Sequence, residues 1–442
     1  MALPQTVESE QPPATSAGSE SYTIPWLIKR NMVFIATAQA CAGVATQLTP
    51  TMGALIAVRL SGTTALAGAA TSMLGLSRLL VAYPLGTITD RFGRRAGLML
   101  GLLLGVIGAL TAGASVVIGS FPLFLLGVFV IGCGSGGIQQ LRVAAADMFP
   151  PARRAEGIGY LLTGSLIGTF GGTGLVSLAT ALSPRLDLDP AALAWFMAPA
   201  VFLPAAFFIA FLRPDPKEIA TNLIRYYPNY RPTAQQRAFE DAGPQGIRAF
   251  VKDYPKRTAF VSYFMVQGNM SMMMAMTSVV LDHHGHGLPA ISLAVAIHVV
   301  GMFGFSLPFG KMSDRIGRRM VMLLGVLMAG GGSLVVVATP DYWPVVFGVF
   351  LVGLGWSAVG VAATALIADR CSPAERGRAI GANDTFGGAA SIAMPLSAGP
   401  LAAAFGLPVV GVFGMAVMLL PLLLLLRLQE TSPGSYAVAQ RS

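Results

Sequence analysis

The sequence has 442 residues, of which 54% are hydrophobic and only 11% are charged, and its formal net charge is +9. Soluble domains carry about 25% charged residues, so this composition excludes a soluble enzyme. Long uncharged runs are typical of a protein that crosses a bilayer several times.

Residues 1–24 are rich in Ser, Pro, Glu and Ala and show no apolar period. Such a composition predicts a disordered tail, which we place in the cytoplasm. No basic region or cleavage site precedes the first apolar run, so the tail does not resemble a signal peptide. The three cysteines are scattered and lack the spacing of a metal site.

Residues 25–212 are predicted to form a bundle of six membrane spans, because a spanning helix needs about 20 apolar residues. Arg78 interrupts the second uncharged run, and the longest run holds two spans that are broken at residues 120–122. In chain order the runs are Asn31–Val58, Thr63–Thr89, Ala96–Leu141, Gly157–Pro184 and Pro190–Leu212.

Residues 213–257 are rich in charge, proline and glycine, and we predict that they form a cytoplasmic linker. Residues 258–427 are predicted to form six further spans, with His298 inside the second and a break near residues 405–408 in the longest run. Residues 428–442 are predicted to be a cytoplasmic tail. The runs are Thr258–Leu281, Leu288–Gly310, Met320–Pro340, Tyr342–Ala368 and Thr385–Leu426.

The distribution of basic residues predicts the orientation of the chain, because Lys and Arg collect on the cytoplasmic side of a membrane. With both termini in the cytoplasm, 25 of the 29 basic residues fall on cytoplasmic segments. The expected fold is therefore an all-α, multi-pass protein with twelve transmembrane helices in two six-helix bundles. The positive net charge follows from this topology and does not indicate nucleic-acid binding.

An internal repeat supports two equivalent halves. The loop from Gly86 to Arg95 reads GTITDRFGRR, and the loop from Gly310 to Arg319 reads GKMSDRIGRR. A second pair of matching segments, around Asp147 and Asp369, recurs at nearly the same spacing. Two independent motifs that share one spacing so closely predict a duplicated half.

These loops are predicted to gate the cytoplasmic side. Gly93 and Gly317 permit the positive φ that a tight turn between helices requires. Asp90 and Asp314 are expected to accept hydrogen bonds from helix N-termini, or from Arg154 and Arg376 across the bundle. The predicted gating residues are Asp90, Arg91, Gly93, Arg94, Arg95, Asp147, Arg154, Asp314, Arg315, Gly317, Arg318, Arg319, Asp369 and Arg376.

With these two loops and twelve spans, the sequence resembles the major facilitator superfamily. The resemblance implies two parallel-related bundles, a central binding site and alternating access by rocking of one half against the other. The fourth span lacks the central arginine of many proton-coupled members, and the fifth lacks the Gly-Pro pattern of drug antiporters. Both departures count against proton-driven drug export.

Soft side chains are concentrated in the seventh and eighth spans. Met270 and Met274 are four residues apart, as are His298 and Met302, so each pair shares one helix face. Counted from the cytoplasmic ends at Thr258 and Asp314, Met270 and Met302 lie equally deep, and Met274 and His298 lie equally deep one turn farther in. Three thioethers and an imidazole at matched depths favour a Cu(I) site. Ordinary packing of methionine is the alternative.

The two four-residue frames also resemble those of the CcoA-like copper importers, a bacterial branch of the same superfamily. This resemblance implies that Met270, Met274, His298 and Met302 bind copper as the transported substrate. The branch is also similar to members known as riboflavin transporters, so an organic substrate remains the alternative.

The segment between these two spans is predicted to face outside and contains three of the four histidines of the chain. It either gathers a metal ion at the entrance of the pathway or forms a hydrophilic turn. The candidate entrance residues are Asp282, His283, His284 and His286.

Other polar residues inside the spans are candidates for the wall of a central cavity, because polar groups are costly in lipid. Asp384 is either a carrier of a proton or ion, or a group that reaches the cytoplasmic surface. If these residues line the cavity, an organic substrate with hydrogen-bonding groups becomes plausible. The candidates are Arg78, Gln139, Gln140, Arg142, Gln267, Asn269 and Asp384.

We therefore predict a monomeric transporter of the bacterial inner membrane that imports copper by alternating access. A carrier of a small organic solute, such as a riboflavin-like metabolite or a drug, is the first alternative, for import or efflux. A membrane sensor that does not transport is the second. No enzyme motif is present, so neither an activity nor a required cofactor is expected.

Overall fold

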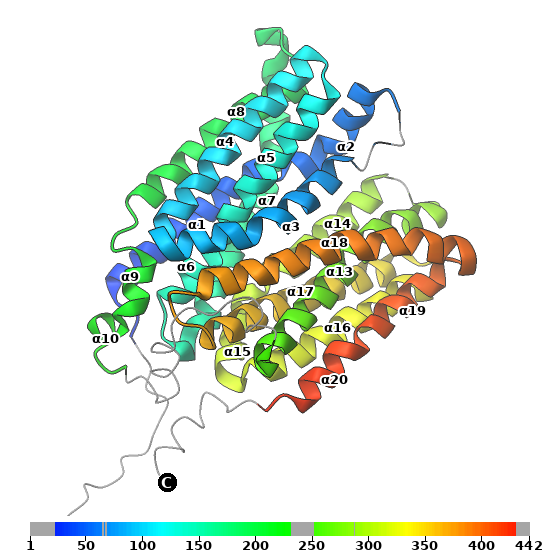
Figure 1. Cartoon of the computed structure of the whole chain (residues 1–442). Helices are drawn as coiled ribbons and strands as arrows, with labels where there is room; N and C mark the ends of the chain where they lie inside the picture. Colours follow the sequence, from blue (N-terminus) through cyan, green and yellow to red (C-terminus); the bar gives the residue numbers. More distant parts are fainter. Residues whose placement is uncertain (1–22, 64–65, 67–68, 231–251, 287, 430–442) are drawn as a thin grey trace, which may run out of the picture.

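The computed structural model describes residues 23–63, 66, 69–230, 252–286 and 288–429. These residues form helices and no strands, which confirms the all-α fold class. The predicted tails, except for residues 23–24 and 428–429, and most of the predicted linker lie outside the described residues. Helices of the two halves form separate groups that meet along one interface (Figure 1).

The first half contains the helices that correspond to the first six predicted spans. The first span is divided between α1 and α2, and the fourth between α5 and α6. The helices are α1 (Trp26–Thr46), α2 (Leu48–Ser61), α3 (Ala69–Phe92), α4 (Arg94–Ile118), α5 (Phe121–Gln139), α6 (Leu141–Asp147), α7 (Arg154–Leu186) and α8 (Pro190–Ala210).

Two short helices of the linker follow, α9 (Pro216–Thr221) and α10 (Leu223–Tyr226). The second half then divides its second and sixth spans in a similar way. Its helices are α13 (Tyr254–His283), α14 (Leu288–Gly304), α15 (Ser306–Ile316), α16 (Arg318–Ala338), α17 (Tyr342–Asp369), α18 (Arg376–Phe405), α19 (Leu407–Val417) and α20 (Leu419–Arg427).

Each of the twelve predicted spans coincides with one helix or with two consecutive helices. Among the described residues, eight helical segments are long and apolar enough to cross a membrane by length and composition. The other four predicted spans correspond to α1–α2, α3, α13 and α18. The last three are less apolar because they carry polar side chains, such as Arg78 on α3, Gln267 on α13 and Asp384 on α18.

Glycine makes the two repeated loops possible. Gly93 joins α3 to α4 with a φ of 93°, and Gly317 joins α15 to α16 with a φ of 98°. Side chains with a Cβ rarely adopt these angles, so the positive φ predicted for both turns is observed.

The halves pack against each other chiefly through α3 with α18 and through α7 with α15. Figure 1 shows α3 and α18 side by side across the interface. A Cβ on Gly86 would overlap the carbonyl oxygen of Gly377, and one on Gly310 would overlap that of Ala155. Glycine at these positions therefore lets the two backbones approach closely.

The beginning of the linker is packed on the first half. Tyr227 donates a hydrogen bond to the Met148 carbonyl at 3.0 Å, and its ring is part of the core of that half. The second half begins earlier than the sequence pattern suggests, because α13 already starts at Tyr254. The residues between the halves that lie outside the described structure are therefore 231–251.

Candidate functional site: two ion-pair clusters and a polar centre

Charged residues from both repeated loops form two clusters at one end of the interface. The first ion-pair cluster consists of Asp90, Arg94, Asp147, Arg376 and Arg378. Asp90 accepts hydrogen bonds from the backbone N–H groups of residue 377 at 2.9 Å and of Arg378 at 2.8 Å. Arg94 contacts Asp90 at 2.6 Å and Asp147 at 2.7 Å. Arg376 of the second half also pairs with Asp147. The first cluster therefore joins the two halves.

The second ion-pair cluster consists of Asp314, Arg318, Asp369, Arg154 and Glu156. Asp314 accepts from the backbone N–H groups of residue 155 at 3.3 Å and of Glu156 at 2.7 Å. Arg318 pairs with Asp314 and contacts Asp369 at 3.2 Å. Arg154 of the first half contacts Asp369 at 2.9 Å. These partners are the counterparts, through the internal repeat, of those in the first cluster.

In both clusters an aspartate of one half caps the first turn of a helix of the other half. Asp90 caps α18, and Asp314 caps α7. The first N–H groups of a helix have no partner within the helix, and the helix dipole favours a negative charge there. Because the carboxylates are largely buried, these contacts hold the halves together at this end, which we call the ion-pair face.

The remaining predicted gating residues lie around the clusters. Arg91 and Arg315 are exposed at the ends of their helices, whereas the backbone N–H of Arg95 donates to Asp215 of the linker at 3.0 Å. Arg319 donates to the carbonyl oxygens at the end of α20, at 2.9 and 3.0 Å. The structure therefore divides the predicted set into residues that join the halves, residues that fix turns or helix ends within one half, and the two exposed arginines.

A second group of polar residues lies farther along the interface. Arg142 of α6 forms an ion pair with Asp384 of α18 at 2.5 Å, and both side chains are largely buried. The hydroxyl of Tyr263, on α13, lies beside Arg142. This ion pair joins two of the predicted cavity residues across the halves. The contact makes Asp384 a buried partner of arginine, rather than a group that extends to the membrane surface.

Amide, hydroxyl and indole groups extend this polar centre into the second half. The amide nitrogen of Gln267 donates to Ser391 at 3.0 Å and to Ser271 at 3.4 Å. The indole N–H of Trp356 donates to the Gln267 oxygen at 2.6 Å. Phe303 packs edge-on against Trp356, with ring centroids 5.7 Å apart. Aromatic faces and hydrogen-bonding edges therefore lie together.

Several buried polar atoms of α3 and α18 have no hydrogen-bond partner among the described residues. They include Nε of Arg78, both amide atoms of Asn383 and one carboxylate oxygen of Asp384. The positions that correspond to these residues through the internal repeat are apolar. Leu161 and Leu162 stand in place of Asn383 and Asp384, and Met302 stands in place of Arg78. The polar centre is therefore a property of one side of the interface, and such atoms are available to a ligand.

Three other cavity candidates have different surroundings. Gln140 is buried and accepts from Thr89 at 3.4 Å, near the ion-pair face, while Gln139 is half-buried at the end of α5. Asn269 donates to Ser333 of α16 at 2.9 Å. The Asn269 side chain therefore lies between α13 and α16 within one half.

The predicted copper ligands lie on α13 and α14. Met270 and Met274 are half-buried and pack beside other methionines of the second half. His298 is 1% exposed, and its Nδ1 lies 2.8 Å from the carbonyl oxygen of Val349 on α17. Its Nε2 has no hydrogen-bond partner among the described residues. The backbone N–H of Met302 lies close to α17 at Gly353.

The histidine segment between α13 and α14 is only partly described. His284 is exposed, and the His286 ring lies 5.3 Å from that of Tyr342. The side chains of Asp282 and His283 lie outside the described residues. Within the described part of the chain, no group of three or more His, Cys, Asp or Glu side chains is arranged to hold a metal ion.

Comparisons with known proteins agree with this architecture. The family profile described as Major Facilitator Superfamily matches residues 33–237 and 259–441. The uncharacterized MFS-type transporter YdeG of Bacillus subtilis is 28% identical over 375 residues, which are 81% of this chain and 83% of that protein. The riboflavin transporter RfnT of Brucella anthropi is 28% identical over 359 residues, which are 80% of this chain and 85% of that protein.

A similar fold is found among solved structures. The proton:xylose symporter XylE, bound to 6-bromo-6-deoxy-D-glucose, matches with a TM-score of 0.70 and 16% sequence identity. The match covers 92% of this chain and 97% of XylE. At this identity the likeness shows a shared fold.

Proposed function

The chain belongs to the major facilitator superfamily and is a secondary membrane transporter, and we propose that its substrate is a small, planar organic solute of the riboflavin kind. The observation that carries this proposal is the polar centre between the halves. A carrier of this fold binds its substrate at the interface of its two halves. The buried Nε of Arg78, which lies beside Gly388 of α18, and one carboxylate oxygen of Asp384 lie at that interface and have no protein partner among the described residues.

The chemistry of the polar centre suits a heteroaromatic ring system. Gln267 and the serines beside it offer donors and acceptors for the edge of a ring, while Trp356 and Phe303 offer apolar faces. Ligand sites of this type are mostly apolar, with a few well-placed polar groups. The similarity to RfnT supports the same class of substrate.

The two ion-pair clusters support alternating access. We propose that the ion-pair face is cytoplasmic, in the inner membrane of a bacterium, because the basic loops lie there. The described state is then closed toward the cytoplasm. Inward opening requires Asp90 and Asp314 to release the N-termini of α18 and α7, after which water and neighbouring arginines solvate the carboxylates.

Copper import is the second candidate, and the buried imidazole of His298 favours it. Since Nδ1 is fixed by the Val349 carbonyl, a neutral imidazole would direct the lone pair of Nε2 away from this contact. A histidine oriented in this way by a backbone carbonyl is a common metal ligand. Met270 and Met274 would supply soft sulfur atoms.

Uptake by cells that cannot synthesise riboflavin tests the first candidate. Cells expressing the chain are expected to accumulate radiolabelled riboflavin with saturation. Gln267→Ala is expected to raise KM about tenfold, because a buried hydrogen-bonding group is worth about 1–3 kcal/mol. Asn269→Ala is the matched control on the same helix, since its side chain faces α16. Uptake that does not differ between these variants, at equal protein amounts, would count against the proposed site.

Radiocopper uptake tests the second candidate in the same cells. Met270→Leu removes a thioether while nearly conserving volume, and Met272→Leu makes the same change at a fully buried core position. Loss of copper uptake in Met270→Leu and His298→Ala, with uptake retained in Met272→Leu, would favour copper. Equal uptake in all variants would remove the copper site from consideration.

A further inference from the structure

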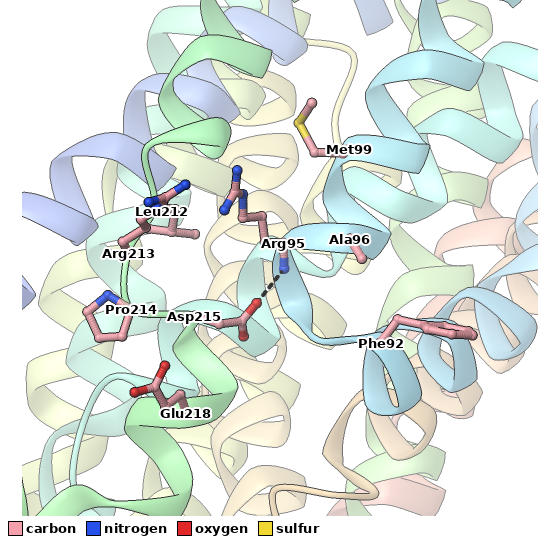
Figure 2. Close-up of a pocket in the computed structure, with 9 residues that line it drawn as sticks. All are labelled: Phe92, Arg95, Ala96, Met99, Leu212, Arg213, Pro214, Asp215 and Glu218. Atoms are coloured by element: carbon pink, nitrogen blue, oxygen red, sulfur yellow. Dashed lines mark hydrogen bonds between the residues drawn. The ribbon is translucent and has the colours of Figure 1, made fainter.

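A cavity of about 590 Å³ opens at the ion-pair face, outside the interface between the halves. It lies among the end of α3, the start of α4 and the beginning of the linker (Figure 2). Its lining residues are Phe92, Arg95, Ala96, Met99, Leu212, Arg213, Pro214, Asp215 and Glu218. A volume in this range is sufficient for a small ligand or a lipid headgroup.

Two guanidinium groups in this cavity are not committed to protein partners. Neither Arg95 nor Arg213 has a side-chain hydrogen bond or ion pair with any described residue, although acidic side chains lie nearby. Asp215 is already engaged, because it accepts from the backbone N–H groups of residues 94, 95 and 217. Figure 2 shows its carboxylate directed at the backbone of Arg95. Glu218 is exposed at the rim of the cavity.

The duplicated half shows what an arginine at this position does when a protein partner is present. Arg319 corresponds to Arg95 in the repeated loops, and its guanidinium donates to the carbonyl oxygens of Leu425 and Leu426 at the end of α20. In the first half the chain turns into the linker after α8, and a cavity takes the place of such a contact. Arg95 is thus left with donors that a ligand can use.

The surface above the cavity is apolar. Met99 is 36% exposed and Leu103, one turn farther along α4, is 56% exposed. On the neighbouring helix α8, Phe207 and Phe211 are 59% and 56% exposed, with ring centroids 4.7 Å apart. Figure 1 shows α4 and α8 side by side. Two basic groups below an apolar surface match the polar and apolar parts of a phospholipid.

We propose that this cavity binds the headgroup of one membrane phospholipid, with its phosphate on Arg95 and Arg213. Glu218 at the rim selects phosphoethanolamine, because its carboxylate pairs with the ammonium group of that headgroup. The acyl chains lie along α4 and α8 against Met99 and Phe211. The site is separate from the polar centre and does not depend on the identity of the transported solute.

Native mass spectrometry of the purified full-length protein, titrated with phosphatidylethanolamine or phosphatidylglycerol, tests this proposal. The wild type is expected to retain one phosphatidylethanolamine, and the double variant Arg95→Gln/Arg213→Gln is expected to bind it at least about tenfold more weakly, as charge-assisted hydrogen bonds are lost. The matched control, Arg225→Gln/Arg427→Gln, removes two exposed arginines elsewhere and is expected to bind normally.

Glu218→Gln separates recognition of the headgroup from folding, because this exposed side chain does not contribute to the core. It is expected to weaken binding of phosphatidylethanolamine and to leave that of phosphatidylglycerol unchanged. Equal binding by the wild type and the Arg95→Gln/Arg213→Gln variant, at equal thermal stability, would overturn the site. Equal preference for both lipids in the wild type would overturn the assignment to phosphoethanolamine.

Discussion

Asp90→Asn is expected to open the ion-pair face, because it weakens the cap that one half places on α18 of the other. Asp90 accepts three hydrogen bonds across the halves: two from backbone N–H groups at 2.9 and 2.8 Å, and one from the Arg378 side chain at 3.3 Å. Asparagine is nearly isosteric, but it keeps only one acceptor oxygen and no charge.

The magnitude follows from these contacts. The substituted asparagine would retain one of the two oxygen positions and lose the bonds to the other. A hydrogen bond to a charged group contributes about 1.5–3 kcal/mol, and water replaces part of it once the face opens. The closed state should therefore lose about 2 kcal/mol relative to the open state, which is about a 30-fold change in their ratio.

Cys371 offers a natural probe for this opening. Its side chain is 4% exposed and lies in the turn between α17 and α18, beside the first ion-pair cluster. Burial raises the pKa of its thiol to about 12, so the closed state should react slowly with a maleimide. In a background with Cys41→Ser and Cys133→Ala, the labelling rate, corrected for thiol ionisation through its pH dependence, should report the open population, because the charge of Asp90 also raises the pKa of this thiol.

Asp90→Asn is expected to increase the labelling rate of Cys371 by about 30-fold, up to the limit set by a fully open population. Asp253→Asn is the control, since the Asp253 carboxylate accepts from the backbone N–H of Lys256 at the start of α13 and, among the described residues, from no group of the first half. A labelling rate in Asp90→Asn that equals the rate in the control would refute the role of the cap. The purified variant must retain its thermal unfolding transition for the comparison to hold.

Three further predictions follow from the packing of the interface and of the second half. Gly86→Ala should also open the ion-pair face and accelerate Cys371 labelling, because overpacking against α18 costs about 1–3 kcal/mol. The control Gly174→Ala should leave the labelling rate unchanged, because no atom lies within 4 Å of the Cβ that it adds. Arg142→Gln should lower the free energy of unfolding by about 3 kcal/mol, because it leaves the buried Asp384 carboxylate unpaired. The double variant Arg142→Gln/Asp384→Asn should lower it by less, and equal losses in thermal unfolding in detergent would contradict this coupling. Asn269→Ala should lower the free energy of unfolding by about 1–2 kcal/mol, seen as a lower unfolding temperature, and leave uptake per molecule unchanged. A selective loss of uptake would instead place Asn269 in the transport pathway.

Much of the architecture could be predicted from the sequence, because the bilayer leaves few alternatives to long helices. The uncharged runs locate the helices, and the repeated Asp-Arg-x-Gly-Arg-Arg loops indicate two equivalent halves. The positive φ of Gly93 and Gly317 also follows from the motif. The helices that carry polar side chains, α3, α13 and α18, are the least apolar, and they contribute side chains to the polar centre.

Partners across the interface could be predicted only in part. The sequence suggested that Asp90 would contact a helix N-terminus or an arginine such as Arg154. In the structure Asp90 caps α18, whereas Arg154 pairs with Asp369 and Arg376 with Asp147. Both outcomes satisfy the same local chemistry, so the choice depends on how the two halves are docked. Spacing along the chain carries no information about that docking.

The polar centre shows a similar limit. Tyr263, Trp356 and Ser391 were missed because aromatic and hydroxyl side chains are common in apolar helices. Gln267 and Asn269 are two residues apart and looked equivalent, yet one faces α17 and α18 and the other faces α16. The helical period separates their faces, but it does not tell which neighbour each face meets.

Counterflow in liposomes tests the central claim, that this chain carries a planar organic solute by alternating access, most directly. The purified protein is reconstituted, the vesicles are loaded with unlabelled riboflavin, and entry of labelled riboflavin is followed. Saturable entry that internal riboflavin accelerates is expected, because a loaded carrier returns its site to the outside. Entry that does not saturate and that is indifferent to the internal solute would contradict the account.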